Sequence, residues 1–334
     1  MEKQEIITEM DGHEIRLSRL DKVFYPRSGF TKGKMIDYYV QIAPFLLPHL
    51  QGRPLTLKRY PEGVEGIFFY EKNCPAYRPK WMKTARVWSE GSQRHMFYCV
   101  VEDAASLVWL ANLANIEMHT SLSRAPEIDR PTVIAFDLDP GSPATIAPCC
   151  QVALCIREIF ACLGLQAFPK TSGSKGLQIY VPLNTPVTCD QTKAFAHTIA
   201  LQLAARYPDR VVSDMKKSLR AGKVFVDWSQ NDAHKTTVCV YSLRAKERPT
   251  VSTPITWDEV ENCLKNKDPE LLVFTSDQVL KRAEEMGDLF EPILQLKQEL
   301  PELSALECIQ SAPPAAVRSR EDKSAASRAS GKRA

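Results

Sequence analysis

The sequence predicts an α+β fold in which helices flank a central sheet. Apolar runs of strand length occur at 132–139, 177–183 and 223–229, each bounded by glycine, proline or charged residues. Longer helical patterns at 148–163 and 191–207 alternate with these strands. The composition, 44% apolar and 25% charged over 334 residues, is that of an ordinary globular chain with one large domain or two moderate ones.

The first third of the chain contains a helix, a hairpin and a second helix. Residues 36–50 have a helical pattern that two prolines interrupt, and 53–71 form a predicted hairpin with a Pro-Glu-Gly turn at 61–63. Residues 104–114 are a strongly apolar helix.

The remaining elements follow from similar boundary signals. The 132–139 strand stops at Pro140, the 148–163 helix has proline at its start and Gly164 just past its end, and the 191–207 helix stops at Pro208. The other predicted elements are a strand at 237–242 and helices at 257–265, 276–285 and 290–300. This order places the candidate acidic residues described next on one central sheet.

Three aspartates form the candidate metal site. Asp137 and Asp139 are two residues apart in a predicted strand, so their carboxylates point to the same face. Asp227, in another apolar strand, would complete an all-oxygen site suited to Mg²⁺ or Mn²⁺. The simpler alternatives are that Asp137 and Asp139 cap the turn at Pro140 and that Asp227 lies on an exposed strand edge.

A turn rich in glycine, serine and lysine lies between the acidic strands, at 171–176. Its backbone N–H groups, Ser172, Ser174 and Lys175 are suited to bind phosphate, although its glycine spacing differs from the Walker pattern and a plain solvated loop is the alternative. Gln178 and Tyr180 would share one face of the following strand. Carboxylates for a metal ion beside a phosphate-binding turn suggest phosphoryl or nucleotidyl transfer.

Further cations and aromatic rings are candidates for contacts with a polyanion. His119, Arg124 and Arg244 lie in or near predicted strands and could neutralise a triphosphate, or form surface ion pairs. The remaining candidates are Phe68 and Phe69, near Lys58 and Arg59, for stacking on a base, Lys22 and Lys32 on either side of a Tyr-Pro turn, and Arg220 in the basic loop 216–223. Packing of the rings in the core and solvation of the basic side chains are the alternatives.

Charge and cysteine content restrict the protein class further. The net charge is +3, and the tail from Ala312 contributes six Lys/Arg and two acidic residues, a net of +4, which leaves the rest at −1. Binding of a nucleic acid must therefore depend on local basic patches.

The ten cysteines form no C-x-x-C pair and are expected to be buried, reduced thiols. No membrane span or signal peptide is recognised, so we expect a cytoplasmic location without membrane association; residues 311–334 are expected to form a basic disordered tail.

From about Leu20 to about Phe290 the chain resembles the polymerase domain of bacterial ligase D, an archaeo-eukaryotic primase-like polymerase of non-homologous end joining. The matching segments are 20–26, 31–33, 52–56, 68–69, 109–112, 136–140, 171–177, 226–227, 241–245 and 251–254. The resemblance implies a primase-polymerase catalytic core with a central, mostly antiparallel sheet, plus a smaller N-terminal α/β portion. We expect a single domain over 1–300, with about 1–100 for DNA and template contacts and about 101–300 for catalysis.

The resemblance also implies roles for individual residues. Two divalent ions, Mn²⁺ or Mg²⁺, would be held by Asp137, Asp139 and Asp227. His119, Ser172, Ser174, Lys175 and Arg244 would contact an incoming NTP or dNTP; Lys22 and Lys32 would hold a 5′-phosphate downstream of a gap; and Phe68 and Phe69 would stack on a template base. The family works beside Ku and a DNA ligase and accepts ribonucleotides.

One departure and three alternatives remain open. Many members have histidine at the Gln178 position, and an amide there can only hydrogen-bond, so we expect a difference in triphosphate affinity or in its pH dependence. The favoured hypothesis is a template-dependent nucleotidyltransferase that fills short gaps at double-strand breaks. The alternatives are a primase that starts chains on single strands, a module that bridges DNA ends, and, more weakly, a two-metal nuclease.

Overall fold

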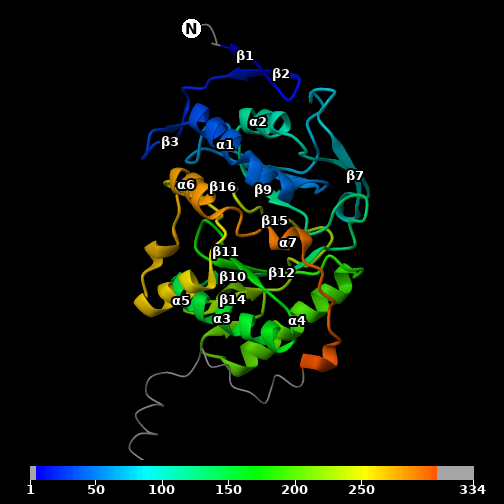
Figure 1. Cartoon of the computed structure of the whole chain (residues 1–334), viewed down its shortest axis with the longest axis vertical. Coiled ribbons are helices and arrows are strands. Elements are labelled where there is room, and N and C mark those ends of the chain that lie inside the picture. The colour runs from blue at the N-terminus through cyan, green and yellow to red at the C-terminus, as the bar shows by residue number, and fades with distance from the viewer. Residues whose placement is uncertain (1–4, 307–334) are drawn as a thin grey trace, which may run out of the picture.

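A computed structural model describes residues 5–306 of the chain. Figure 1 shows two layers stacked along the long axis, with the blue and cyan N-terminal elements at one end and the green central elements at the other. Each layer is built on its own sheet and its own hydrophobic core. The α+β class predicted from the sequence, with mostly antiparallel sheets and flanking helices, is confirmed.

The first layer contains a six-stranded sheet. Its strands run in the order β15-β9-β5-β8-β7, with β6 paired to β5. The bounds are β5 (Leu55–Arg59), β6 (Phe69–Glu71), β7 (Thr84–Ser89), β8 (Arg94–Cys99), β9 (Asn115–Thr120) and β15 (Thr237–Val238). Helix α1 (Lys32–Leu50) packs against the apolar α2 (Ala104–Asn112) beside this sheet.

Helix α1 is continuous, although its two prolines predicted an interruption. The side chain of Thr31 caps its start by accepting from the Lys34 N–H at 3.2 Å. Pro44 and Pro48 lie inside the helix. The helix persists because its apolar face is buried against α2, and tertiary packing offsets the lost backbone hydrogen bonds.

Smaller elements complete the first layer. They are the hairpins β1 (Glu5–Met10) with β2 (His13–Ser18), β3 (Val23–Tyr25) with β4 (Phe30–Thr31) and β16 (Leu243–Ala245) with β17 (Pro249–Val251), and the helices α6 (Ser276–Met286) and α7 (Pro292–Gln295).

The second layer is a five-stranded sheet with helices on one face. The strand order is β11-β12-β10-β14-β13, antiparallel except for the parallel β13–β14 pair. The bounds are β10 (Val133–Pro140), β11 (Phe168–Thr171), β12 (Leu177–Pro182), β13 (Val211–Val212) and β14 (Val224–Asp227). Helices α3 (Ile146–Cys162) and α4 (Cys189–Arg206) pack on this sheet, and α5 (Trp257–Asn266) packs on α3.

Alternation along β10 separates its structural face from its functional face. Ile134, Phe136 and Leu138 are fully buried in the core under α3 and α4. The intervening side chains, including Asp137 and Asp139, must then point to the opposite face of the sheet. That face is turned toward the first layer, so the two carboxylates lie between the layers.

Two predicted elements are shorter than expected. The 237–242 strand is reduced to β15, which pairs with β9 of the first layer. The chain then turns, with the Ser242 N–H donating to the Cys239 carbonyl at 3.2 Å and Tyr241 in a left-handed conformation at φ 62°. The 290–300 helix is reduced to α7. Beyond it, Gln298 is held in an extended segment by hydrogen bonds to Gln166 and to the Pro182 carbonyl.

The predicted 53–71 hairpin exists as the antiparallel β5–β6 pair. Its connection is longer than the predicted 61–63 turn, because β6 begins only at Phe69. The nine described cysteines are free thiols, seven of them buried, as expected. Within residues 5–306 none of the helices combines the length and apolar character needed to cross a membrane. The predicted tail at 311–334 lies outside the described residues.

Candidate functional site

The three predicted metal-binding aspartates lie on the adjacent strands β10 and β14, and two of them, Asp137 and Asp139, line one cleft, whereas Asp227 does not. Asp137 lies directly opposite Asp227 across the β10–β14 pair, and Asp139 follows two residues along. Asp137 and Asp139 line a cleft with a volume of about 590 Å³. The sequence pattern that predicted a shared face for these carboxylates is therefore matched by their positions in the sheet.

The electrostatics of this carboxylate cluster favour a bound cation. Burial raises the pKa of Asp137 to about 7, with Asp139 and Asp227 adding to the rise and a hydrogen bond from Gln178 opposing it. Burial and Asp227 also raise the pKa of Asp139. The Oδ1 atom of Asp137 is enclosed and has no hydrogen-bond partner. Clustered carboxylates with an unsatisfied oxygen fit a hard divalent ion with oxygen ligands.

Asp227 is oriented differently from the other two. Its Oδ1 accepts from the backbone N–H and the hydroxyl of Ser229 at 2.9 and 2.6 Å, and its Oδ2 accepts from Gln230 at 2.8 Å. No group of three or more His, Cys, Asp or Glu side chains in residues 5–306 is gathered closely enough to hold a metal ion. A site using all three aspartates would need Asp227 to exchange at least one of these contacts.

The turn at 171–176, predicted to bind phosphate, lies directly against β10, the strand that carries Asp137 and Asp139. A Cβ at Gly176 would lie 2.1 Å from the Leu138 carbonyl oxygen, so only glycine allows this approach. Gly173 has φ +65°, and a Cβ there would lie 2.5 Å from the Val251 carbonyl carbon. The Ser172 hydroxyl accepts from the Ser174 and Gly176 N–H groups, which shapes the turn and occupies two of the predicted phosphate donors.

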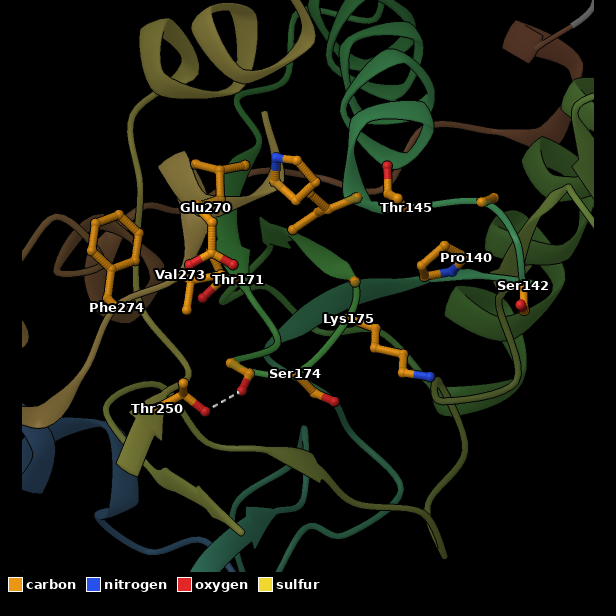
Figure 2. Close-up of a pocket in the computed structure, with 16 residues that line it drawn as sticks. Pro140, Ser142, Thr145, Thr171, Ser174, Lys175, Thr250, Glu270, Val273 and Phe274 are labelled. Carbon is orange, nitrogen blue, oxygen red and sulfur yellow. Dashed lines mark hydrogen bonds between the residues drawn. The ribbon is translucent and has the colours of Figure 1, made fainter. Parts of the chain in front are cut away.

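A second cavity lies on the other side of this turn. It has a volume of about 320 Å³, and Figure 2 shows Lys175 and Ser174 beside it, between the start of α3 and the Thr250 strand. The same two residues also line the cleft that contains Asp137 and Asp139. The turn is thus a thin wall with open space on both sides, fixed at one end by the Thr250 hydroxyl, which donates to the Gly173 carbonyl at 2.7 Å.

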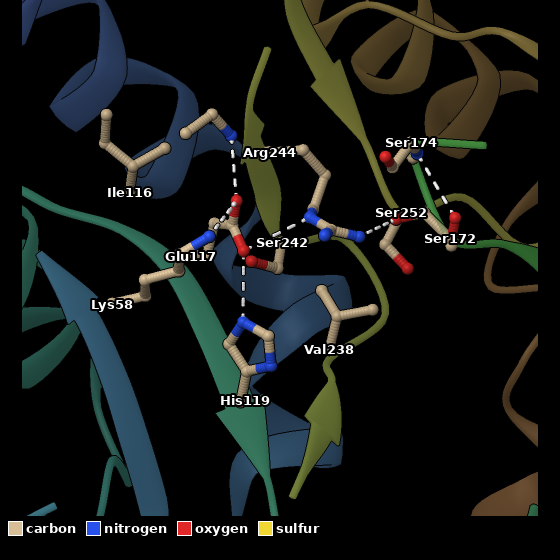
Figure 3. Close-up of polar contacts among 12 residues, drawn as sticks. Lys58, Ile116, Glu117, His119, Ser172, Ser174, Val238, Ser242, Arg244 and Ser252 are labelled. Atoms are coloured by element: carbon tan, nitrogen blue, oxygen red, sulfur yellow. Dashed lines mark hydrogen bonds and ion pairs between the residues drawn. The ribbon is translucent and has the colours of Figure 1, made fainter. Parts of the chain in front are cut away.

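Two predicted nucleotide-binding cations meet at one buried carboxylate. His119 Nε2 lies 3.1 Å from Glu117 Oε2, and Arg244 Nε lies 3.3 Å from the same oxygen. Figure 3 shows both side chains converging on Glu117, with Arg244 reaching on toward the backbone of Ser172, which it contacts. Arg124 lies beyond the end of β9, over Gly52, and is not among the residues that line the cleft.

Gln178 faces the first aspartate directly. It is opposite Asp137 in the β10–β12 register, is almost fully buried, and contributes the hydrogen bond that lowers the pKa of Asp137. Its Oε1 atom has no hydrogen-bond partner. The Gln178 amide is therefore placed between the carboxylates of Asp137 and Asp139 and the 171–176 turn.

The predicted stacking rings are exposed and accompanied by cations. Phe68 and Phe69 are 48% and 42% exposed, which excludes the alternative of a core position. Lys58 Nζ lies 4.5 Å from the centre of the Phe68 ring, and the Arg59 guanidinium lies 5.2 Å from that of Phe69. Exposed rings beside basic groups suit stacking on bases.

The two predicted phosphate-binding lysines lie near each other but have protein partners. Lys32 is buried and donates to the Ser18 carbonyl at 2.6 Å and to Asn112 at 2.7 Å. Burial lowers its pKa to about 8, and the charges of Arg19 and Lys22 contribute. Lys22 donates to the Pro61 carbonyl and to Glu62, each at 2.6 Å. Lys32 is thus not the solvated side chain that the alternative assumed.

Arg220 lies close to the acidic cluster. Its guanidinium is 3.5 Å from the centre of the Phe225 ring, one hydrogen bond ties it to the Met215 carbonyl, and its charge lowers the pKa of Asp139. It is therefore fixed near the second sheet and is not a freely solvated loop residue.

The cleft unites most of the predicted residues and adds several that the sequence did not indicate. The predicted members are Asp137, Asp139, Ser172, Ser174, Lys175, Gln178, His119 and Arg244. The added members are Thr56, Tyr70, Lys72, Gln230, His234, Lys235, Thr236, Thr237 and Val238. Most of the added residues follow Asp227 or lie on β6, and their only sequence signal was proximity to a predicted motif.

Comparison with known proteins gives a consistent result. The primase-polymerase domain family of LigD matches residues 31–290. The chain is 42% identical over 287 residues to the multifunctional non-homologous end joining protein LigD of Mycolicibacterium smegmatis and 32% identical over 294 residues to the bifunctional LigD protein of Bacillus subtilis. These matches cover 85% and 88% of this chain, but the chain spans only 37% and 46% of those relatives.

A solved structure resembles this chain over nearly the whole length of the solved chain. The polymerase domain from Mycobacterium tuberculosis ligase D, in complex with DNA, superposes with a TM-score of 0.78 at 40% identity. The match covers 85% of this chain and 99% of that one.

Proposed function

The chain belongs to the LigD primase-polymerase family, and from that premise we propose that it is a template-dependent nucleotidyltransferase that fills short gaps at DNA double-strand breaks. The observation that carries the proposal is the cleft in which Asp137 and Asp139 face Lys175 and Arg244. Carboxylates for divalent ions opposite cations for a triphosphate are what nucleotidyl transfer requires. The DNA in the M. tuberculosis structure supports DNA as the partner.

Each side of the cleft would have its own task. Asp137, Asp139 and a reoriented Asp227 would hold two divalent ions, Mn²⁺ or Mg²⁺. When bound, such ions lower the pKa of a primer 3′-hydroxyl and stabilise charge on a triphosphate. Lys175 and Arg244 would bind phosphate oxygens and offset the charge that develops there during transfer.

The DNA would be bound mainly by the first layer. Phe68 and Phe69 would stack on a template base, Arg220 would contact the backbone, and Lys22 and Lys32 would bind the 5′-phosphate on the far side of a gap. Residues 1–300 would then act as a single domain, with the first part serving DNA contacts and the rest catalysis. We further propose a bacterial cytoplasmic location, acceptance of ribonucleotides, and Ku and a DNA ligase as partners, as the end-joining relatives suggest.

Primer extension on a one-nucleotide gap tests this function. The assay compares gaps with and without a downstream 5′-phosphate, Mn²⁺ with Mg²⁺, and ribo- with deoxyribonucleotides. Templated addition that the 5′-phosphate stimulates is the expected result, and the Asp137→Ala variant should lose addition while binding DNA normally. Retained addition by that variant would contradict the assignment of Asp137.

The same assay separates the alternatives. Synthesis of a dinucleotide from two free nucleotides would indicate a primase. Full end joining by the Asp137→Ala variant would indicate a bridging module. Release of pyrophosphate with each addition excludes a nuclease.

A further inference from the structure

A buried carboxylate that the proposed reaction does not use connects the nucleotide side of the cleft to the DNA side. Glu117 is on β9 and is 1% exposed. Its Oε2 faces His119 at 3.1 Å and Arg244 at 3.3 Å, and its Oε1 faces Lys58 at 3.5 Å and accepts from the Ala245 N–H at 3.1 Å. One carboxylate thus faces three basic side chains and one backbone N–H, which come from β5, β9 and β16 (Figure 3).

The charge on Glu117 is retained despite its burial. Burial alone would raise the pKa of this carboxyl, but the hydrogen bond from His119 and the charges of Arg244, His119 and Lys58 hold its pKa well below the usual range. An ionised buried carboxylate is tolerated only when it is fully paired. Glu117 therefore stays anionic at every pH at which a polymerase would work.

This carboxylate determines which atoms His119 and Arg244 present to the cleft. With Nε2–H of His119 directed at Glu117, the Nδ1 atom is the ring nitrogen that remains for a ligand. Arg244 forms an ion pair with Glu117, with Nε 3.3 Å from Oε2, and one of its terminal nitrogens donates to the Ser172 carbonyl. The guanidinium therefore lies across the gap between β16 and the 171–176 turn. Both side chains are ordered before a nucleotide arrives, which reduces the entropy cost of binding it.

The other oxygen of Glu117 leads to the exposed rings. Lys58, held by Oε1, lies 4.5 Å from the centre of the Phe68 ring and 5.6 Å from that of Tyr70. The Tyr70 ring in turn makes an edge contact with His119, with centroids 6.2 Å apart. Glu117 therefore lies at the junction of the proposed nucleotide and template contacts.

We propose that Glu117 is a positioning residue that fixes His119 and Arg244 for the incoming triphosphate and Lys58 beneath the template-stacking ring. The proposal rests on the proposed polymerase function for its ligands. Glu117 is buried and is not among the residues that line the cleft, so it would act only through the groups around it.

Replacement of Glu117 by glutamine tests this role in the full chain. Glutamine keeps the length and an acceptor for the Ala245 N–H but removes the charge that His119, Arg244 and Lys58 share. We expect the KM for the nucleotide in Mn²⁺-dependent gap filling to rise by about tenfold, which corresponds to about 1.4 kcal/mol of binding. The matched control is Glu259→Gln, which removes the ion pair of Glu259 with Arg282 yet keeps the helix cap, and its nucleotide KM should match the wild type.

The pKa of His119, measured by NMR titration, is a readout that a merely structural role would not move. The groups facing its ring are Glu117, Arg244 and Lys58, together with the Tyr70 ring. Burial lowers the His119 pKa and Glu117 raises it, whereas Arg244 and Lys58 lower it. Removal of the carboxylate charge should therefore lower the pKa of His119 further. An unchanged His119 pKa in the folded Glu117→Gln chain would overturn the proposal.

A double-mutant comparison checks that Glu117 acts through its partners. In an Arg244→Ala background, the added Glu117→Gln change should raise the nucleotide KM by clearly less than tenfold, because one of the groups it positions is already gone. A full, additive tenfold rise would refute the positioning role. If the glutamine variant does not fold, Glu117→Asp keeps the charge but withdraws it by one methylene, and an unchanged nucleotide KM would then be the refuting result.

Failure of this inference can be told apart from failure of the proposed function. Absence of any nucleotide addition by the wild-type chain would contradict the polymerase proposal. The His119 titration needs no catalysis, and binding of Mn²⁺·GTP can be titrated without DNA. If the wild-type chain extends primers and the Glu117 variants leave both the His119 pKa and the nucleotide KM unchanged, only the positioning role of Glu117 is refuted.

Discussion

The aspartate cluster should destabilise the protein when no cation is bound, and this can be measured with Asp137→Asn. Asparagine has the same shape as aspartate, and the Oδ1 atom of Asp137 has no partner to lose. The hydrogen bond from Gln178 can still be accepted by the asparagine oxygen. The substitution therefore removes mainly the charge of one carboxylate beside Asp139 and Asp227.

The size of the effect follows from the raised pKa of Asp137. Burial and the neighbouring carboxylates raise it from 3.8 to about 7, and each pKa unit corresponds to about 1.4 kcal/mol. A folded-state pKa above the unfolded one means that stability falls as pH rises, and the full penalty applies above about pH 7. The upper bound is about 4 kcal/mol, and because water reaches the cleft we expect about 2 kcal/mol.

Urea unfolding at pH 8 in EDTA provides the assay. The Asp137→Asn chain should be more stable than the wild type by about 2 kcal/mol and should melt roughly 4 °C higher, although it should no longer extend primers. The gain should shrink as pH falls from 7 toward 4, because the folded-state carboxyl becomes protonated over this range, and it should vanish below about pH 3, where the carboxyl is protonated in both states. An asparagine variant that is equally or less stable at pH 8 would refute the electrostatic reasoning.

Three further predictions concern other parts of the molecule. Asp288→Asn removes the negative charge opposite His49, whose Nε2 lies 2.7 Å from Asp288 Oδ2, and should cost roughly 3 kcal/mol in urea unfolding at pH 7. His49 and Tyr241 lower the pKa of Asp288 against the effect of burial, so this cost should shrink as pH falls below about 4. A cost that does not change with pH would contradict this reasoning. The pKa of Lys32 is lowered to about 8 by burial and nearby cations, so the preference for a 5′-phosphorylated gap should weaken between about pH 7 and 9. This preference should be absent in Lys32→Met at any pH. The ratio of gap-filling rates on gaps with and without the 5′-phosphate measures the preference. Gln178→His should make the nucleotide KM fall toward about pH 6, where the imidazole becomes cationic, and identical pH profiles of the two chains would show that the amide and the imidazole act alike.

The part of the site predicted from the sequence was the part that depends on local geometry. Side-chain alternation is a property of a strand itself, so the shared face of Asp137 and Asp139 could be inferred without knowledge of the neighbouring strands. The positions of Gly173 and Gly176 also fitted a tight turn, and the structure shows that a Cβ at either position would clash with another strand.

The remaining features depend on which strands become neighbours. Gln178 lies opposite Asp137 only because β12 pairs with β10 in one particular register. Glu117 had no signal in the sequence, since its partners come from positions 58, 119, 244 and 245. The burial of Lys32 likewise depends on distant contacts with Ser18 and Asn112.

The path of the chain between the two cores has a consequence for how the protein folds. The core of the first layer includes residues from both ends of the described chain, among them Ile15, Tyr241 and Phe290, whereas the second core is built mainly from the middle. No single cut can therefore release one complete layer. A fragment beginning near residue 101 would leave β9 without its β5 partner and its apolar edge open to aggregation. We therefore expect the two layers to unfold in one cooperative transition, so that limited proteolysis yields no stable half.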